Sequence, residues 1–179
     1  MSVFTNPSDG AGDAATAYVR ATLGLLGDRA PVSVLRSTPA ELAAIVEAHS
    51  VEALTTPERA GKWSATQVMQ HLADSDLVWA YRMRMVLAHD QPILSGYDQD
   101  AWAERLNYAA VVPTDALRQF AFLRELNLGL IGGLSNANLQ RTSLHSERGE
   151  ERLDHMIDLY AGHDLVHLRQ LNRILAAVS

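Results

Sequence analysis

The chain contains no cysteine. This absence excludes disulfides, zinc sites built from thiolates, and cysteine nucleophiles. Histidine, aspartate and glutamate are then the only strong metal ligands that the sequence offers. Any zinc site would therefore be rich in histidine, of which the chain has seven.

The sequence also lacks a long apolar run, a signal-like N-terminus and a basic cluster. No stretch approaches the length of a membrane span, and the first ten residues have neither a positively charged region nor an apolar one. The formal net charge of −6 argues against a nucleic-acid surface. We therefore expect a cytoplasmic protein with no membrane partner and no nucleic-acid partner.

The length of 179 residues suits one domain that buries its own core. Residues 1–12 are rich in serine, glycine, proline and aspartate, which predicts a flexible N-terminal leader. Residues 13–179 are expected to form a single helical domain.

Helical periodicity accounts for most of this domain. The predicted helices cover residues 13–26, a short stretch that begins at 38, residues 64–88, 114–132 and 151–177. Capping signals support three of the starts, because Thr38 precedes Glu41 by three positions, Ser64 precedes Gln67 in the same way, and Thr114 opens the fourth helix.

The segments between these helices show no alternation of apolar and polar residues that would indicate strands. Residues 51–61 are expected to be a connector, residues 135–149 a polar loop, and residues 89–113 a long crossing with one short helix after Asp98. The prediction is an all-α four-helix bundle with short accessory helices and one long crossover.

The last predicted helix carries two histidines, His163 and His167, four residues apart. Residues at this spacing lie above one another on a helix face, so two imidazoles can converge on one ion. Both histidines fall on a stripe that a helix turns toward a bundle core, formed by Met156, Tyr160, His163, His167, Gln170 and Ile174. The alternative is a pair of core-edge histidines that bond to neighbouring side chains, and a third ligand has to decide between the two.

His71 is the best candidate for that third ligand. It lies about a turn and a half inside the helix that Ser64 caps, next to the core position Leu72. His49 and His89 lie at predicted helix C-termini, where a cation complements the helix dipole.

Two strings of the sequence resemble the DinB-like superfamily, which includes the YfiT-like metal-dependent hydrolases. The first is Lys62-Trp63-Ser64, which leads to His71-Leu72, and the second is the closing pattern His163, His167, Gln170. The chain departs from the family pattern in having Asp76 where glutamate is common. The resemblance covers nearly the whole chain.

This resemblance implies a four-helix bundle, usually a homodimer, in which His71, His163 and His167 hold one divalent ion per chain. Imidazole nitrogens suit zinc, nickel, copper and iron, and zinc or nickel is expected. Related bundles act as bacillithiol S-transferases or mycothiol-dependent isomerases. The resemblance therefore implies a metal-dependent enzyme on a small-molecule substrate, with bacillithiol or another low-molecular-weight thiol as cosubstrate in detoxification or stress response. Metal-dependent hydrolysis is the first alternative, and metal binding without turnover is the second.

Asp74 and Tyr160 are the candidate catalytic residues. Asp74 and the adjacent Ser75 follow His71 closely enough to orient a ligand or a bound water, although Asp74 alternatively is a solvated helix residue. Tyr160 stands one turn before His163 and is expected either to donate its hydroxyl to a substrate or to pack as a core-edge tyrosine.

The sequence leaves two interpretations open for three further residues and gives no role for a fourth. Arg82 pairs either with an acidic group of a ligand or with a buried carboxylate, and Asp164 is a surface charge or a helix-pairing charge. Glu147 is either a base or a loop charge. His145 and Glu147 belong to a segment, residues 144–149, that recurs in the resembling family without a settled role.

Overall fold

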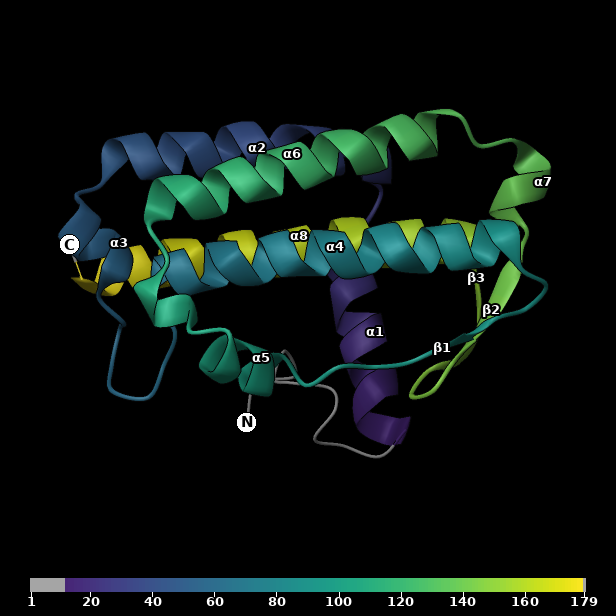
Figure 1. The fold of residues 1–179 in the computed structure, drawn as a ribbon, viewed down its shortest axis with the longest axis horizontal. Helices are drawn as coiled ribbons and strands as arrows, with labels where there is room; N and C mark the ends of the chain where they lie inside the picture. Colours follow the sequence, from purple (N-terminus) through teal and green to yellow (C-terminus); the bar gives the residue numbers. More distant parts are fainter. Residues whose placement is uncertain (1–11, 179) are drawn as a thin grey trace.

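The computed structural model describes residues 12–178, and four long helices form its bundle. These helices are α2 (Pro31–Ala48), α4 (Ala65–Ala88), α6 (Pro113–Gly132) and α8 (Leu153–Val178). They run along the long axis of the molecule, with α4 packed against α6 and α8, and α2 packed against the same two helices (Figure 1). The predicted four-helix bundle is confirmed. The leader expected over residues 1–12 lies, except for Gly12, outside the described residues.

The prediction for the start of α4 is also confirmed. The Ser64 side chain accepts a hydrogen bond from the Gln67 amide at 3.3 Å, and the Gln67 side chain accepts one from the Ser64 amide at 2.9 Å. This capping box sets the register of α4 and, with it, the direction of His71.

Helix α2 begins at Pro31, earlier than the predicted start at Thr38. Pro39 lies inside the helix, and its missing N–H leaves the carbonyl of Leu35 without a helical donor. Arg124 Nη1 from α6 fills that position, at 2.8 Å from the Leu35 oxygen. A tertiary contact therefore allows the helix to pass through a residue that locally favours a helix start.

Two other boundary predictions are wrong. The expected connector contains a short helix, α3 (Val51–Thr55), which Ser50 caps through the Ala53 amide. Helix α6 begins at Pro113 after Val112, without a side-chain cap from Thr114, because proline at the first helical position has no N–H to satisfy.

The expected polar loop folds into a hairpin, so the prediction of no strands between the helices is wrong here, while the fold remains a helical bundle. Strands β2 (Thr142–His145) and β3 (Gly149–Arg152) pair antiparallel, β1 (Ile93–Leu94) adds a parallel edge, and α7 (Asn136–Leu139) precedes the hairpin. The inward residues of the hairpin include Ser143, His145 and Glu151, all of which are buried. A strand that buries polar side chains shows no hydrophobic alternation, so its period was invisible in the sequence.

The long crossover is present and returns along the bundle from the hairpin end (Figure 1). It carries the expected short helix, α5 (Gln99–Arg105), whose start Asp98 caps by accepting from the amides of Asp100 and Ala101. The short 3-10 turn η2 (Tyr108–Ala110) follows before α6 begins.

Helix α1 (Gly12–Leu26) lies across the bundle and packs on α8 (Figure 1). The two helices meet at Gly162, where a Cβ would lie 2.6 Å from Cγ2 of Thr22 and 2.7 Å from its carbonyl oxygen. Glycine is required at this point, and the close approach locates α1 beside His163.

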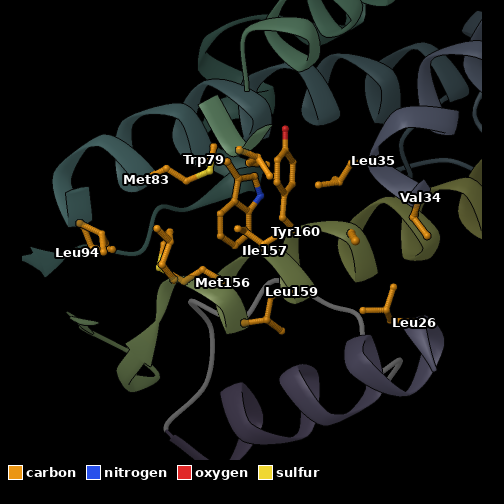
Figure 2. Packing of buried hydrophobic residues seen from close by; sticks show 14 residues of the cluster. Leu26, Val34, Leu35, Trp79, Met83, Leu94, Met156, Ile157, Leu159 and Tyr160 are labelled. Carbon is orange, nitrogen blue, oxygen red and sulfur yellow. The ribbon is translucent and has the colours of Figure 1, made fainter. Parts of the chain in front are cut away.

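The bundle core divides into two apolar clusters. One contains Trp79, Met83, Met156 and Tyr160, with the rings of Trp79 and Tyr160 stacked at a centroid distance of 5.1 Å (Figure 2). The other surrounds Leu72, Phe120 and Leu171. No helix among the described residues is long and apolar enough to cross a membrane.

Candidate metal centre

The structure brings together the three histidines that the sequence singled out. Nε2 of His163 lies 3.2 Å from Nε2 of His71 and 3.1 Å from Nε2 of His167. His71 comes from α4 and the other two come from α8, and the potential ligand atoms of all three lie within 4.8 Å of one another. Packing of α4 on α8 thus completes a set that no single helix could supply.

These nitrogens have the spacing that one metal ion requires. Two nitrogens that bind one zinc ion tetrahedrally at about 2.0–2.1 Å lie about 3.3 Å apart. The two observed separations, 3.1 and 3.2 Å, agree with this value. The residues therefore fit a divalent ion that is held by three imidazoles.

The hydrogen bond on the outer side of His167 supports the same conclusion. Its Nδ1 donates to Oε1 of Gln170 at 2.8 Å, because an amide oxygen can only accept. Nε2 of His167 then carries the lone pair, directed at the other two rings. Nδ1 of His71 and Nδ1 of His163 are buried, and neither has a hydrogen-bond partner among the described residues.

All three rings favour the neutral form that binds metals. Burial, with a smaller contribution from neighbouring histidines, holds the pKa of His71 and that of His163 well below the ordinary value. Burial lowers the pKa of His167 to about 4. Near neutral pH the three side chains therefore offer lone pairs to a cation and are not repelled by its charge.

A small cavity of about 70 Å³ adjoins the histidines. We call it the His163 pocket, and its lining includes Ser75, Trp79, Arg82, Tyr97, Glu147 and His163. The Ser75 hydroxyl lies 3.4 Å from Nε2 of His71 and 3.0 Å from the Tyr97 hydroxyl. Ser75 thus connects the histidine cluster to a tyrosine of the crossover.

Asp74 lies beside this centre and is held by other side chains. Its carboxylate accepts hydrogen bonds from the Tyr108 hydroxyl and, at 3.2 Å, from Nε2 of Gln70. The Trp63 ring lies between Tyr108 and His71, with centroid distances of 6.4 and 5.2 Å. Among the described residues, no hydrogen bond joins Asp74 to a histidine ring.

Tyr160 belongs to a different buried cluster, which we call the Arg124 network. The Tyr160 hydroxyl accepts from Nε of Arg124 at 3.0 Å and from Nδ2 of Asn127 at 3.1 Å. Asp164, next to His163 in the chain, is fully buried and accepts from Arg124 at 2.6 and 2.9 Å. The interpretation of Asp164 as a helix-pairing charge is therefore confirmed, and the surface interpretation is wrong.

Asp76 is the second carboxylate of the Arg124 network, and both Nε and Nη2 of Arg124 donate to it, at 3.0 and 2.9 Å. Burial raises the pKa of Asp76 to about 6, although Arg124 opposes this change. Burial disfavours the charge on Arg124, but Asp164 and the other network groups hold its pKa above the ordinary range.

The sequence reasoning missed Arg124 and Tyr97. Arg124 occupies a buried stripe of α6, formed by Ala116, Phe120, Arg124, Asn127 and Ile131, whereas Phe122 and Leu126 are 62% and 47% exposed. The helical spacing of this stripe is present in the sequence, but Phe122 and Leu126 make a second, exposed face equally apolar, so hydrophobicity alone does not identify the buried side. Tyr97 had no sequence signal, because only the path of the crossover places it beside Ser75.

Comparison with known proteins agrees with this geometry. A family model described as the DinB superfamily matches residues 35–171. The chain is 31% identical over 149 residues to a Bacillus subtilis protein named "Putative metal-dependent hydrolase YfiT", covering 79% of this chain and 82% of that protein. A similarly named protein of Oceanobacillus iheyensis is 30% identical over 123 residues, covering 69% and 71% of the two chains.

A solved structure of Bacillus subtilis YfiT is also similar, with a TM-score of 0.71 and 28% identity over 80% of this chain and 84% of that one. That protein is described as having an unusual four-helix bundle topology. The matched residues 35–171 include the three clustered histidines. On this evidence the chain belongs to the DinB superfamily.

Proposed function

We propose that the protein is a divalent-metal-dependent enzyme in which His71, His163 and His167 hold one ion beside a small-molecule substrate. The observation that carries this proposal is the convergence of three neutral Nε2 atoms next to a pocket that His163 itself lines. Three protein ligands leave a coordination position open, as in catalytic sites and unlike closed structural ones. When bound, a divalent ion supplies Lewis acidity and lowers the pKa of a coordinated thiol or water.

The reaction we propose is transfer of a low-molecular-weight thiol of the bacillithiol type to an electrophile, in detoxification or stress response. The family resemblance supports this class of reaction. The chain has no cysteine, so the sulfur has to come from a cosubstrate. The thiol loses its proton to solvent, a sulfur–carbon bond forms, and the leaving group departs with its electron pair.

The residues of the chain that serve this step surround the pocket. Tyr97 and Ser75 share a hydrogen bond beside His71, so their hydroxyls are placed to hold a polar atom of the substrate. Burial raises the pKa of Tyr97, which keeps its hydroxyl protonated as a donor. Asp74 acts through Tyr108 in this proposal, as a residue that positions the Trp63 ring against His71.

Hydrolysis of a small molecule is the second candidate. The names of the Bacillus and Oceanobacillus relatives favour it. Glu147 also lines the pocket and supplies a carboxylate that could serve as a base.

One set of assays separates the candidates. Metal-loaded protein is tested on monochlorobimane with bacillithiol, mycothiol, glutathione or no thiol, and on ester, amide and phosphoester probes, each with and without chelator. We expect turnover of the bimane only with a thiol and the metal together, and its loss in His167→Ala. Hydrolytic turnover without thiol would replace the transferase proposal with the hydrolase. No turnover with any probe, together with loss of stability on chelation, would indicate metal binding without catalysis.

The metal and the assembly state complete the proposal. We propose zinc or nickel as the ion, a cytoplasmic location and a homodimer. Elemental analysis of purified protein identifies the metal. The exposed Phe122 and Leu126 on α6 offer apolar surface for a dimer, and light scattering that finds a monomer at micromolar concentration would reject it.

A further inference from the structure

The His163 pocket contains a buried arginine without a carboxylate partner at ion-pair distance. Arg82 is 6% exposed, and among the described residues no carboxylate oxygen lies within 4 Å of its guanidinium. The one hydrogen bond that its side chain makes with the described part of the chain runs from Nη2 to the Ser95 carbonyl, at 2.7 Å. A guanidinium has five N–H donors, so most of its capacity is unused.

This arrangement is costly for the protein alone. Removing a cation from water is expensive unless an anion accompanies it. Burial, with a further contribution from the nearby Arg148, lowers the pKa of Arg82 to about 10. Arg82 remains charged near neutral pH, and its guanidinium lies beside Trp79, whose ring centroid is 5.7 Å from the guanidinium carbon, without a direct ion pair among the described residues.

The carboxylates of Glu151 and Glu147 offset part of the charge of Arg82, but neither forms an ion pair with it. Arg148 is paired with Glu151, with Nη2 2.9 Å from Oε2. Glu147 lines the pocket, and its carboxylate lies against Gly96, where a Cβ would be 2.0 Å from Oε1. Within the described residues this carboxylate has no ion pair and no hydrogen bond.

We propose that Arg82 binds a carboxylate group of the substrate or cosubstrate, so that the pocket takes carboxylate-bearing small molecules with their reacting end toward His163. This inference rests on the proposed function, because it takes the pocket as the substrate site. A planar carboxylate matches the fork of one guanidinium and its single charge. A phosphate dianion carries more charge than one unpaired arginine balances, and Glu147 stands nearby.

The test measures equilibrium binding to the full-length, metal-loaded protein. NMR titration gives the affinity for butyrate and for its neutral isostere butyramide. We expect butyrate to bind more tightly than butyramide. Arg82→Met should lower the affinity for butyrate by at least about tenfold and leave the affinity for butyramide unchanged. The matched control is Arg84→Met, an exposed arginine two residues along α4 whose Nη1 donates to the Ala80 carbonyl, and it should bind both probes like the wild type.

Two more variants keep the inference testable if Arg82→Met does not fold. Arg82→Lys retains a point charge without the planar fork of the guanidinium. The affinity for butyrate should therefore fall about threefold, while the affinity for butyramide does not change. Glu147→Gln removes a like charge from the pocket, so butyrate should bind about threefold more tightly.

Several outcomes would overturn the proposal. Butyrate binding that survives in Arg82→Met would belong to the metal centre, and equal binding of butyrate and butyramide would show no anion site. Inorganic phosphate that binds more tightly than butyrate, with the same Arg82 dependence, would replace the carboxylate class with phosphorylated ligands. Binding is measured without turnover, so the two proposals can fail separately. If Arg82→Met loses butyrate binding but the wild type shows no activity on any probe, the proposed function is rejected and the anion site stands.

Discussion

The Arg124 network and the histidine cluster share helices α4 and α8, yet they differ in how their polar atoms are satisfied. Asp76 and Asp164 follow Ser75 and His163 directly in α4 and α8. Every side-chain nitrogen of Arg124 donates to an oxygen of the protein. In the histidine cluster, three Nε2 atoms face one another and two Nδ1 atoms have no partner among the described residues.

This difference separates structure from function. The protein itself completes the Arg124 network, which links α2, α4, α6 and α8 through Leu35, Asp76 and Asp164. The histidine cluster has no cation for its converging lone pairs among the described residues. The neighbouring Arg82 has no carboxylate within ion-pair distance there. Polar groups that are buried at a cost and left incomplete are typical of a site that binds something from outside.

The largest expected effect comes from breaking the complete cluster. Arg124→Met leaves two buried carboxylates without a cation and the Leu35 carbonyl without its donor, so the free energy of unfolding should fall by about 3–5 kcal/mol. Urea denaturation measures this loss. Arg118→Met is the control, because Arg118 and Asp115 are 79% and 50% exposed, and it should change stability by no more than about 0.5 kcal/mol. If the free energy of unfolding fell equally in the two variants, Arg124 would have no special structural role.

Metal removal should be the next largest effect, and it acts on the other cluster. An ion present at a hundred times its dissociation constant stabilises the folded state by about 2.7 kcal/mol. Chelation should therefore lower the melting temperature of the wild type and leave that of His167→Ala unchanged. His155→Ala serves as the control, since His155 is not one of the clustered histidines. Full metal occupancy in His167→Ala would contradict the assignment of the site.

Acid should act on the two clusters in opposite directions. In metal-free protein the folded-state pKa of His167, about 4, lies below its ordinary value of 6.5, so the unfolded chain takes up the proton first. Its stabilisation is complete above pH 6.5 and is lost as the pH falls toward 4, by up to about 1.4 kcal/mol per pH unit for each such histidine. The pKa of Asp76 is raised to about 6, so this group adds stability over the same fall in pH.

Unfolding measured from pH 7 to pH 4 tests these signs. Chelator-treated wild type should lose stability as the pH falls, and Asp76→Asn should lose it more steeply because the opposing proton uptake is gone. A flat pH profile in the wild type would mean that the histidines are not held neutral by burial.

The smallest effect should come from Tyr160→Phe, which tests to which cluster Tyr160 belongs. The hydroxyl accepts from Arg124 and Asn127, so its removal should cost about 1 kcal/mol of stability. Metal content and turnover per folded molecule should stay at the wild-type level. Asp74→Asn is the comparison at the metal centre and should lower turnover with little change in stability. A large loss of turnover in Tyr160→Phe would instead return this tyrosine to the catalytic site.

Much of the metal centre was predictable because it depends on local rules. The spacing of His163 and His167 and the stripe that they share follow from helix periodicity, and the capping box at Ser64 sets the direction of His71. That spacing alone left two interpretations of the pair open. The place of His71 in the capped helix made it the best candidate for a third ligand, and the family resemblance implied the same residue. The packing of α4 on α8 brings the three rings together.

Other features could not be derived locally. Thr38 and Pro39 resemble a helix start in the sequence. The helix continues through them because Arg124, from a distant part of the chain, donates to the Leu35 carbonyl. The hairpin buries Ser143, His145 and Glu151, which contradicts the hydrophobic pattern expected of a strand. The pairing of Tyr97 with Ser75 depends on the route of the crossover.

The sequence by itself determined the helical class, the capped start of α4 and the inward stripe of α8, because each depends on residues within a few turns of one another. Only the tertiary structure decided which charges find partners. Asp164 is neutralised by Arg124, whereas Arg82 is buried without a carboxylate among the described residues. Pairing across helices depends on distances that no local spacing encodes, and here it distinguishes the charges that hold the bundle together from a buried charge without an ion pair.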